Sequence, residues 1–164
     1  MKTITNLFQE APLYTGPMTF FHGGAPGLRV GGWILPPAVT GVATSEEYAT
    51  YPDGVYRRDM VYLVTEVDQA KAFAGLCKTA AVGQGAKARG GDVYRVIPAL
   101  LVSLDPGCRS EGLSWCAPAA RIVAIVATSV RRGPYEKELI DATRAREETP
   151  GQWTRRTFTP TPGR

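Results

Sequence analysis

The chain has 164 residues, of which 44% are hydrophobic and 21% are charged, and its formal net charge is +4. This composition is typical of an ordinary globular domain and excludes the disordered, collagen-like and membrane-spanning classes. The mild basic charge permits a polyanionic partner without requiring one.

The three cysteines, Cys77, Cys108 and Cys116, form no Cys-x-x-Cys pair and have no histidine near them in the sequence. We therefore expect buried thiols and no metal site, with a Cys108–Cys116 bridge as the alternative that spacing leaves open. No signal peptide begins the sequence, and no stretch reaches about 18 apolar residues. These features predict a cytoplasmic protein without a membrane partner.

The first half of the chain predicts two strands and one helix. Met18 to Gly23 is β-branched and aromatic and runs into a glycine-rich loop, which indicates a strand that ends there. Pro36-Pro37 begins a long loop with room for one helical turn. Met60 to Val64 is a second strand, and the helix Glu66 to Ala81 follows, with Thr65 as its N-cap and Asp68 three residues later.

The second half predicts two further strands, Asp92 to Ile97 and Arg121 to Thr128. The second of these is almost continuously apolar, so we expect it at the centre of a sheet. Gly133-Pro134 would begin a last helix. The sequence thus predicts one α+β domain over residues 1–148, with more strands than helices, and a poorly ordered, basic C-terminal tail over residues 149–164.

Three residues in this pattern can carry chemistry. His22 is the only histidine and ends a strand beside two glycines, Tyr62 lies within the second strand, and Asp105 precedes Pro-Gly. Each has an ordinary structural explanation when taken alone, since most histidines are not catalytic and an aspartate before Pro-Gly often begins a turn. Their occurrence together favours a functional site.

Four segments carry a resemblance to a known family. They are FFHG (20–23), LRVGGWILP (28–36), VYLVTEVDQAKAFA (61–74) and GDVYRVIP (91–98). Together they resemble the rifamycin ADP-ribosyltransferases, which belong to the His-Tyr-acid branch with diphtheria toxin and the poly-ADP-ribose polymerases. The resemblance covers residues 18–128 and implies the ADP-ribosyltransferase-like fold, two small antiparallel sheets packed with a few helices.

The resemblance also implies an activity and a set of roles. NAD⁺ would be the co-substrate, with ADP-ribose transferred to a nucleophile and nicotinamide released. His22 would bind the ribose hydroxyl on the adenosine side, and the Gly23 backbone would hold the carboxamide. Tyr62 would stack on the nicotinamide ring, while Asp105 would stabilise the cationic sugar and help activate the acceptor.

The sequence also departs from the family, with longer loops at residues 39–59 and 83–90 and with differences at two further places. Gly24 stands where the family usually has threonine, and the stretch after Asp105 lacks the longer segment of the rifamycin enzymes. We therefore expect acceptor choice to depend on residues 39–59 and 107–115, with Tyr48, Arg109 and Trp115 as candidate contacts.

Several functions remain open at this point. The acceptor of the transfer would be a hydroxyl of a small molecule such as a rifamycin-type antibiotic, which implies a role in antibiotic resistance. The alternative is a protein or nucleic acid, as in toxins and phage defence, which the arginines near the C-terminus favour slightly. An RNA 2′-phosphotransferase would need more histidines, and a binding module without activity would not need all three site residues.

Overall fold

The computed structural model describes residues 11–42, 58–77, 90–105, 114–131 and 133. Its elements in chain order are β1 (Phe20–Gly24), β2 (Trp33–Ile34), α2 (Pro37–Thr40), β3 (Val61–Val64), α4 (Val67–Leu76), β4 (Gly91–Ala99), β5 (Ser103–Leu104), β6 (Ser114–Ala117) and β7 (Ala119–Val130). Strands outnumber helices in this part of the chain, so the predicted α+β class is confirmed. The single helical turn expected after Pro36 is also present, as α2.

The strands form one antiparallel sheet in the order β2-β7-β4-β1-β3-β6-β5. The expectation of two separate sheets is therefore wrong, because hydrogen bonds join the strands of the described residues into one sheet. The connection between the halves is nevertheless narrow, because β1 and β3 pair at one position, Phe21 with Val64. By contrast, β1 pairs with β4 along its whole length, from Phe20 to Gly24. The sheet is therefore close to dividing at the β1–β3 boundary.

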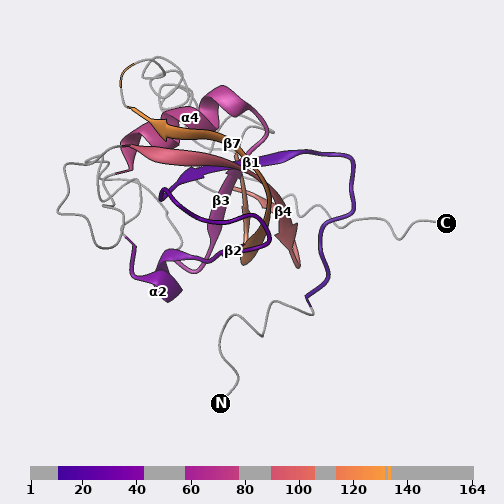
Figure 1. Cartoon of the computed structure of the whole chain (residues 1–164). Coiled ribbons are helices and arrows are strands. Elements are labelled where there is room, and N and C mark those ends of the chain that lie inside the picture. The colour runs from indigo at the N-terminus through magenta and orange to yellow at the C-terminus, as the bar shows by residue number, and fades with distance from the viewer. Residues whose placement is uncertain (1–10, 43–57, 78–89, 106–113, 132, 134–164) are drawn as a thin grey trace, which may run out of the picture.

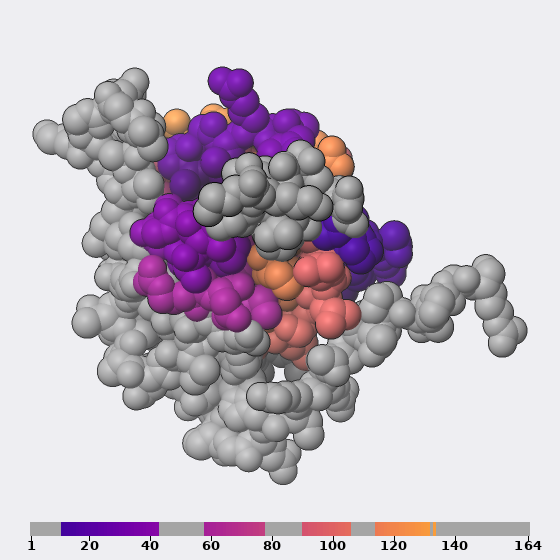
Figure 2. Space-filling view, turned by 90° about the horizontal axis from the view of Figure 1, so that it is seen from below, coloured from indigo at the N-terminus to yellow at the C-terminus, as the bar shows by residue number. Residues whose placement is uncertain are grey.

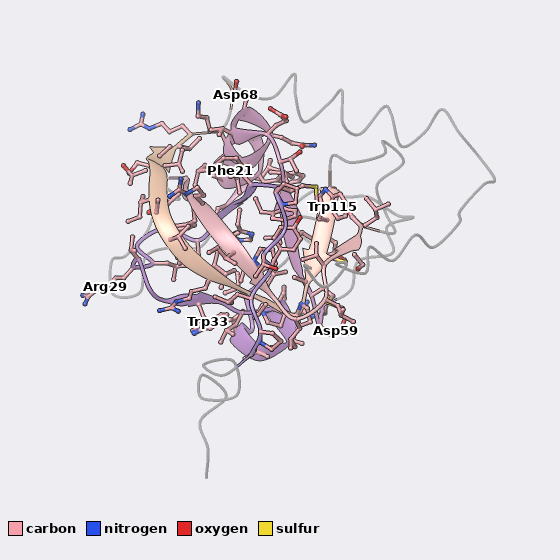
Figure 3. All side chains as sticks on the ribbon, turned by 90° about the vertical axis from the view of Figure 1, so that its right-hand side faces the viewer. Phe21, Arg29, Trp33, Asp59, Asp68 and Trp115 are labelled. Atoms are coloured by element: carbon pink, nitrogen blue, oxygen red, sulfur yellow. The ribbon has the colours of Figure 1, made fainter. Side chains whose placement is uncertain are left out.

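Two apolar clusters pack the two faces of this sheet. The larger joins Phe20 of β1 to Leu63 of β3, Trp115 of β6 and Ile122 of β7. The smaller lies under α4, which covers the other face (Figure 1), and includes Val64, Ala70, Ala74 and Val93. Figure 3 shows Phe21 beneath α4, where it packs against this second cluster. Neighbouring residues of β1 therefore face different clusters, as the alternation of a strand requires.

Helix α4 begins later than the sequence indicates. Its N-cap is Glu66 rather than Thr65, and no side chain caps it. Asp68, which we expected to support a Thr65 cap, instead accepts a hydrogen bond from Lys71 Nζ at 2.8 Å on the exposed side. The helix ends at Leu76 because Cys77 adopts an extended conformation, with ψ at 120°. The expected continuation to Ala81 is thus wrong at Cys77, and residues 78–81 lie outside the described part.

Strand β7 is not central, contrary to expectation. It lies second from one end of the sheet, and β2 pairs with it only at Ala120 and Arg121. Its second half is mostly exposed, and Ile125 and Val126 expose 45% and 41% of their surface. Three register shifts against β4 bend it along its length. Its apolar run therefore reflects β propensity more than burial on both faces, and β4 is the buried strand.

Cys77 and Cys116 are buried, as expected, whereas Cys108 lies outside the described residues. The predicted last helix after Gly133-Pro134 and the predicted tail over 149–164 lie outside them as well. Within the described residues, none of the helices has the length and apolar character needed to cross a membrane.

Gly23 allows α4 to approach β1 closely, and its replacement should be costly. A Cβ at this position would overlap the backbone carbonyl oxygen of Ala70. Gly23→Ala should therefore lower the free energy of unfolding by about 3 kcal/mol or more. Gly31→Ala is the matched control, because nothing lies within 4 Å there and only its φ of 84° is unfavourable, which costs about 1 kcal/mol. Urea titration measures both, and equal losses would contradict the close packing.

Candidate functional site

A cavity of about 220 Å³ lies at the β1–β3 boundary. His22 and Gly23 of β1, Tyr62 of β3 and Asp105 after β5 all line it. These are the four residues for which the family resemblance predicts a nucleotide site, and they come from three separate parts of the sheet. The cavity also contacts members of both apolar clusters, Val61 from the larger and Val64 from the smaller. The cavity therefore lies beside both clusters, at the place where the pairing of β1 with β3 ends.

His22 connects the two strands beyond the point where their backbones pair. Its Nδ1 lies 2.9 Å from the backbone carbonyl oxygen of Tyr62. A carbonyl oxygen only accepts hydrogen bonds, so Nδ1 carries the proton and donates it. In the neutral ring, Nε2 is then an acceptor. The side chain can thus receive a hydrogen bond from a ligand hydroxyl while remaining fixed to β3.

The neutral form of His22 is favoured by its surroundings. Burial lowers the pKa of His22 below its ordinary value of 6.5, and the hydrogen bond to Tyr62 opposes this effect only in part. The imidazole is therefore uncharged at neutral pH. Such a ring is suited to fixing a hydroxyl group by accepting its proton in a hydrogen bond, and less suited to holding an anion.

Gly24 leaves the space that the imidazole occupies. It lies two residues after His22 on the same strand, so both positions face the same side of the sheet. A Cβ at Gly24 would meet His22 Nε2. With the histidine in this orientation, a side chain at position 24 would overlap the ring, so glycine fits there and threonine does not.

Asp105 is an almost completely buried carboxylate at the cavity, with 3% of its surface exposed. Ser114 Oγ donates a hydrogen bond of 2.8 Å to its Oδ2. Tyr62 lines the cavity from β3, which pairs with β6, the strand that carries Ser114. An aromatic face and a carboxylate in one mostly apolar cavity can together bind and stabilise a planar or sugar-centred cation.

A second buried carboxylate holds the loop that follows β1. Asp92 on β4 accepts hydrogen bonds from the Gly27 N–H at 2.9 Å and the Ser129 N–H at 2.8 Å. The neighbouring Tyr94 hydroxyl donates to the Ala25 carbonyl at 2.7 Å and accepts from the Leu28 N–H at 3.1 Å. Because Ala25 and Leu28 line the cavity, these contacts fix one of its walls.

The Tyr94 hydroxyl is held in its protonated form. Burial raises the pKa of Tyr94, and the charge of Asp92 adds to the rise, although the hydrogen bond with Leu28 lowers it. The hydroxyl can therefore donate and accept at the same time. The local sequence pattern predicts Asp92 and Tyr94 only as strand residues, because the loop they hold lies more than sixty positions away.

One wall of the cavity is apolar. It includes Trp33 of β2, Leu35, Pro37 of α2, and Met60, the residue before β3. Figure 2 shows the segments around α2 and β3, purple and magenta, side by side on one face. The Ala38 N–H donates to the Arg58 carbonyl oxygen at 2.7 Å and joins them. In Figure 3, Trp33 lies at the α2 end of the molecule, far from Asp68 on α4.

One expectation about the acceptor side is wrong. Trp115 has 7% of its surface exposed and packs edge-on against Phe20, with ring centroids 6.0 Å apart. It belongs to the core, because β6 turns it toward the larger apolar cluster, and it does not line the cavity. Tyr48 and Arg109 lie outside the described residues. Ser114, which also lines the cavity, was not predicted as a site residue because no motif distinguishes it from other serines.

No model of a protein family matches the chain, and a search of curated proteins finds no match either.

The single histidine makes its protonation state directly measurable. In a ¹⁵N NMR titration, the imidazole should show the Nδ1–H tautomer at neutral pH and a pKa below 6.5, because burial disfavours the charged ring. The unfolded chain then binds the proton more readily, so stability should fall as the pH is lowered from 6.5 toward the folded-state pKa. A pKa at or above 6.5 would contradict the buried geometry.

Gly24→Ala is the variant that tests the position of the ring. Its methyl group would push the imidazole out of its buried position. Burial is the larger influence on the ring, so its relief should move the pKa of His22 back toward 6.5 even though the hydrogen bond to the Tyr62 carbonyl is lost. Gly31→Ala should leave the titration unchanged, since Gly31 faces open space.

Proposed function

We propose that this protein is an NAD⁺-dependent mono-ADP-ribosyltransferase of the His-Tyr-acid type. The observation that carries the proposal is the convergence of His22, Gly23, Tyr62 and Asp105 on one cavity. The resemblance of the sequence to the rifamycin ADP-ribosyltransferases implies a role in nucleotide binding for the same four residues. A sheet that opens between β1 and β3 also provides the site that two-part ADP-ribosyltransferase folds require, and we include that fold in the proposal.

Transfer of ADP-ribose requires two things of the protein, which must bind the reactants and stabilise the positive charge that develops on the sugar. The bond between the nicotinamide nitrogen and the ribose carbon breaks, and its electron pair leaves with nicotinamide, which becomes neutral. The sugar carbon becomes cationic and is captured by an acceptor oxygen, whose proton is released. An enzyme accelerates this by stabilising the cationic sugar more than the starting dinucleotide.

The residues at the cavity divide this work. Nε2 of His22 would accept a hydrogen bond from the ribose on the adenosine side, while Tyr62 would stack on the nicotinamide ring. The Gly23 backbone would hold the carboxamide, since β1 is not paired with β3 beyond Phe21 in the described part of the chain. Asp105 would supply the negative charge next to the reacting carbon and help orient the acceptor.

For the acceptor we propose a hydroxyl of a small, largely apolar molecule, of which a rifamycin-type antibiotic is an example. The wall formed by Trp33, Leu35, Pro37 and Met60 supports this choice. No lysine or arginine is among the described residues that line the cavity. A protein or nucleic-acid acceptor is the alternative, and the C-terminal arginines that favoured it lie outside the described residues.

NAD⁺ binding tests the donor half of the proposal. Calorimetry should find binding to the wild type, and Tyr62→Ala should weaken it about tenfold, the loss expected for one stacking contact of roughly 1.4 kcal/mol. Tyr62→Phe is the matched control, because it keeps both the ring and the backbone carbonyl that His22 uses. Absence of binding to the wild type into the millimolar range would end the proposal.

Nicotinamide release tests the role of Asp105. Asp105→Asn should reduce turnover at least about 100-fold and change the NAD⁺ dissociation constant only a few-fold, because charge stabilisation acts mainly in the transition state. Glu111→Gln, the nearest other acid in the sequence, should keep most of the activity. The opposite pattern would assign the acid to Glu111.

A further inference from the structure

Asp105 and Ser114 form a pair of buried polar residues at the rim between β5 and β6. Their exposed fractions are 3% and 5%, and both line the cavity. Two hydrogen bonds join them. The Asp105 N–H donates to the Ser114 carbonyl oxygen at 3.0 Å, and the Ser114 hydroxyl donates to Asp105 Oδ2 at 2.8 Å.

The two bonds restrict different parts of Asp105. β5 and β6 are antiparallel, and Leu104 pairs with Trp115. Asp105, the residue after Leu104, therefore lies opposite Ser114, the residue before Trp115. The backbone bond extends this ladder by one step and fixes where the Asp105 main chain lies. The backbone bond does not restrict the side-chain torsions of Asp105. The hydroxyl of Ser114 restricts them, because it donates to one carboxylate oxygen and so limits rotation of the carboxylate.

Such a restriction matters for a group that acts through its charge. Stabilisation of a developing cation depends on the position of the carboxylate before the reaction begins, since reorientation during the reaction would cost part of the gain. Ser114, on the strand that pairs with β5, supplies one such restraint on the carboxylate.

We propose that Ser114 is a positioning residue for Asp105, which holds its carboxylate oriented toward the cavity and so raises turnover without contributing to NAD⁺ affinity. The proposal rests on the function proposed above. It assigns to Ser114 a role through Asp105 alone, which distinguishes it from a serine that merely stabilises the sheet.

The same pair of strands offers a matched control. Ser103 on β5 lies 13 positions before Cys116 on β6, and its Oγ is 3.1 Å from the Cys116 Sγ. It therefore makes a comparable side-chain contact across the β5–β6 pair, but it does not line the cavity. A loss of activity caused by general weakening of β5–β6 should appear in Ser103→Ala as well as in Ser114→Ala.

A double-mutant cycle tests the proposal, with nicotinamide release from NAD⁺ as the measured rate. Ser114→Ala should lower kcat about 10- to 100-fold, the range for one hydrogen bond to a charged group, with KM changed only a few-fold. Ser114→Thr, which keeps the hydroxyl, should restore most of the rate. In an Asp105→Asn background, Ser114→Ala should cause no further loss, because the carboxylate it positions is gone.

The outcomes separate the two proposals. If the wild type releases no nicotinamide, the proposed function fails and the role of Ser114 fails with it. If Asp105→Asn is strongly impaired but Ser114→Ala is not, or if the two losses multiply in the double variant, only the role of Ser114 is overturned. An equal loss of kcat in Ser103→Ala would also overturn it, because the effect would then arise from the strands.

Discussion

The narrow connection between β1 and β3 is the constraint on which the site depends. One backbone pair, Phe21 with Val64, keeps the sheet continuous, and the strands diverge immediately beyond it. A cavity inside a sheet would normally leave backbone groups without partners, which is costly. Here the imidazole of His22 meets part of that need by donating to the Tyr62 carbonyl across the opening. The candidate ligand-binding residue therefore also bridges the two halves of the sheet.

The double glycine on β1 satisfies two opposing steric demands at adjacent positions. Gly23 faces α4, where any side chain would overlap the helix backbone, and Gly24 faces the other side, where any side chain would displace the imidazole. Because strand residues alternate between faces, one glycine could not serve both purposes. The pair thus brings the helix close to β1 and leaves the ring its place over the strand. The usual reading of Gly-Gly as a loop signal accounts for neither effect.

The parts of the fold that the sequence predicted are those with strong local signals. The strands near Phe20, Val61 and Asp92 were expected close to where they lie, because each is apolar and bounded by turn residues. The short strands β2, β5 and β6 were missed, since two to four residues carry no periodicity. The length of α4 was overestimated because its apolar spacing continues past Cys77, where the backbone becomes extended. Trp115 was misassigned because β6 was not predicted. Without that strand, the sequence does not indicate which face of the sheet Trp115 occupies.

The two buried carboxylates show why site residues are harder to predict than strands. Asp92 and Asp105 have similar burial, 5% and 3% exposed, and a hydroxyl oxygen lies within hydrogen-bonding distance of each carboxylate. Asp92 also binds two backbone N–H groups of distant segments and lies behind the cavity wall, so its charge is directed to the protein itself. Asp105 lines the cavity, where its charge can act on a bound molecule. That difference depends on which segments meet each carboxylate in space, so neighbouring residues in the sequence cannot reveal it. A serine nine positions away that fixes one carboxylate oxygen is equally invisible there, although it decides where the charge is directed.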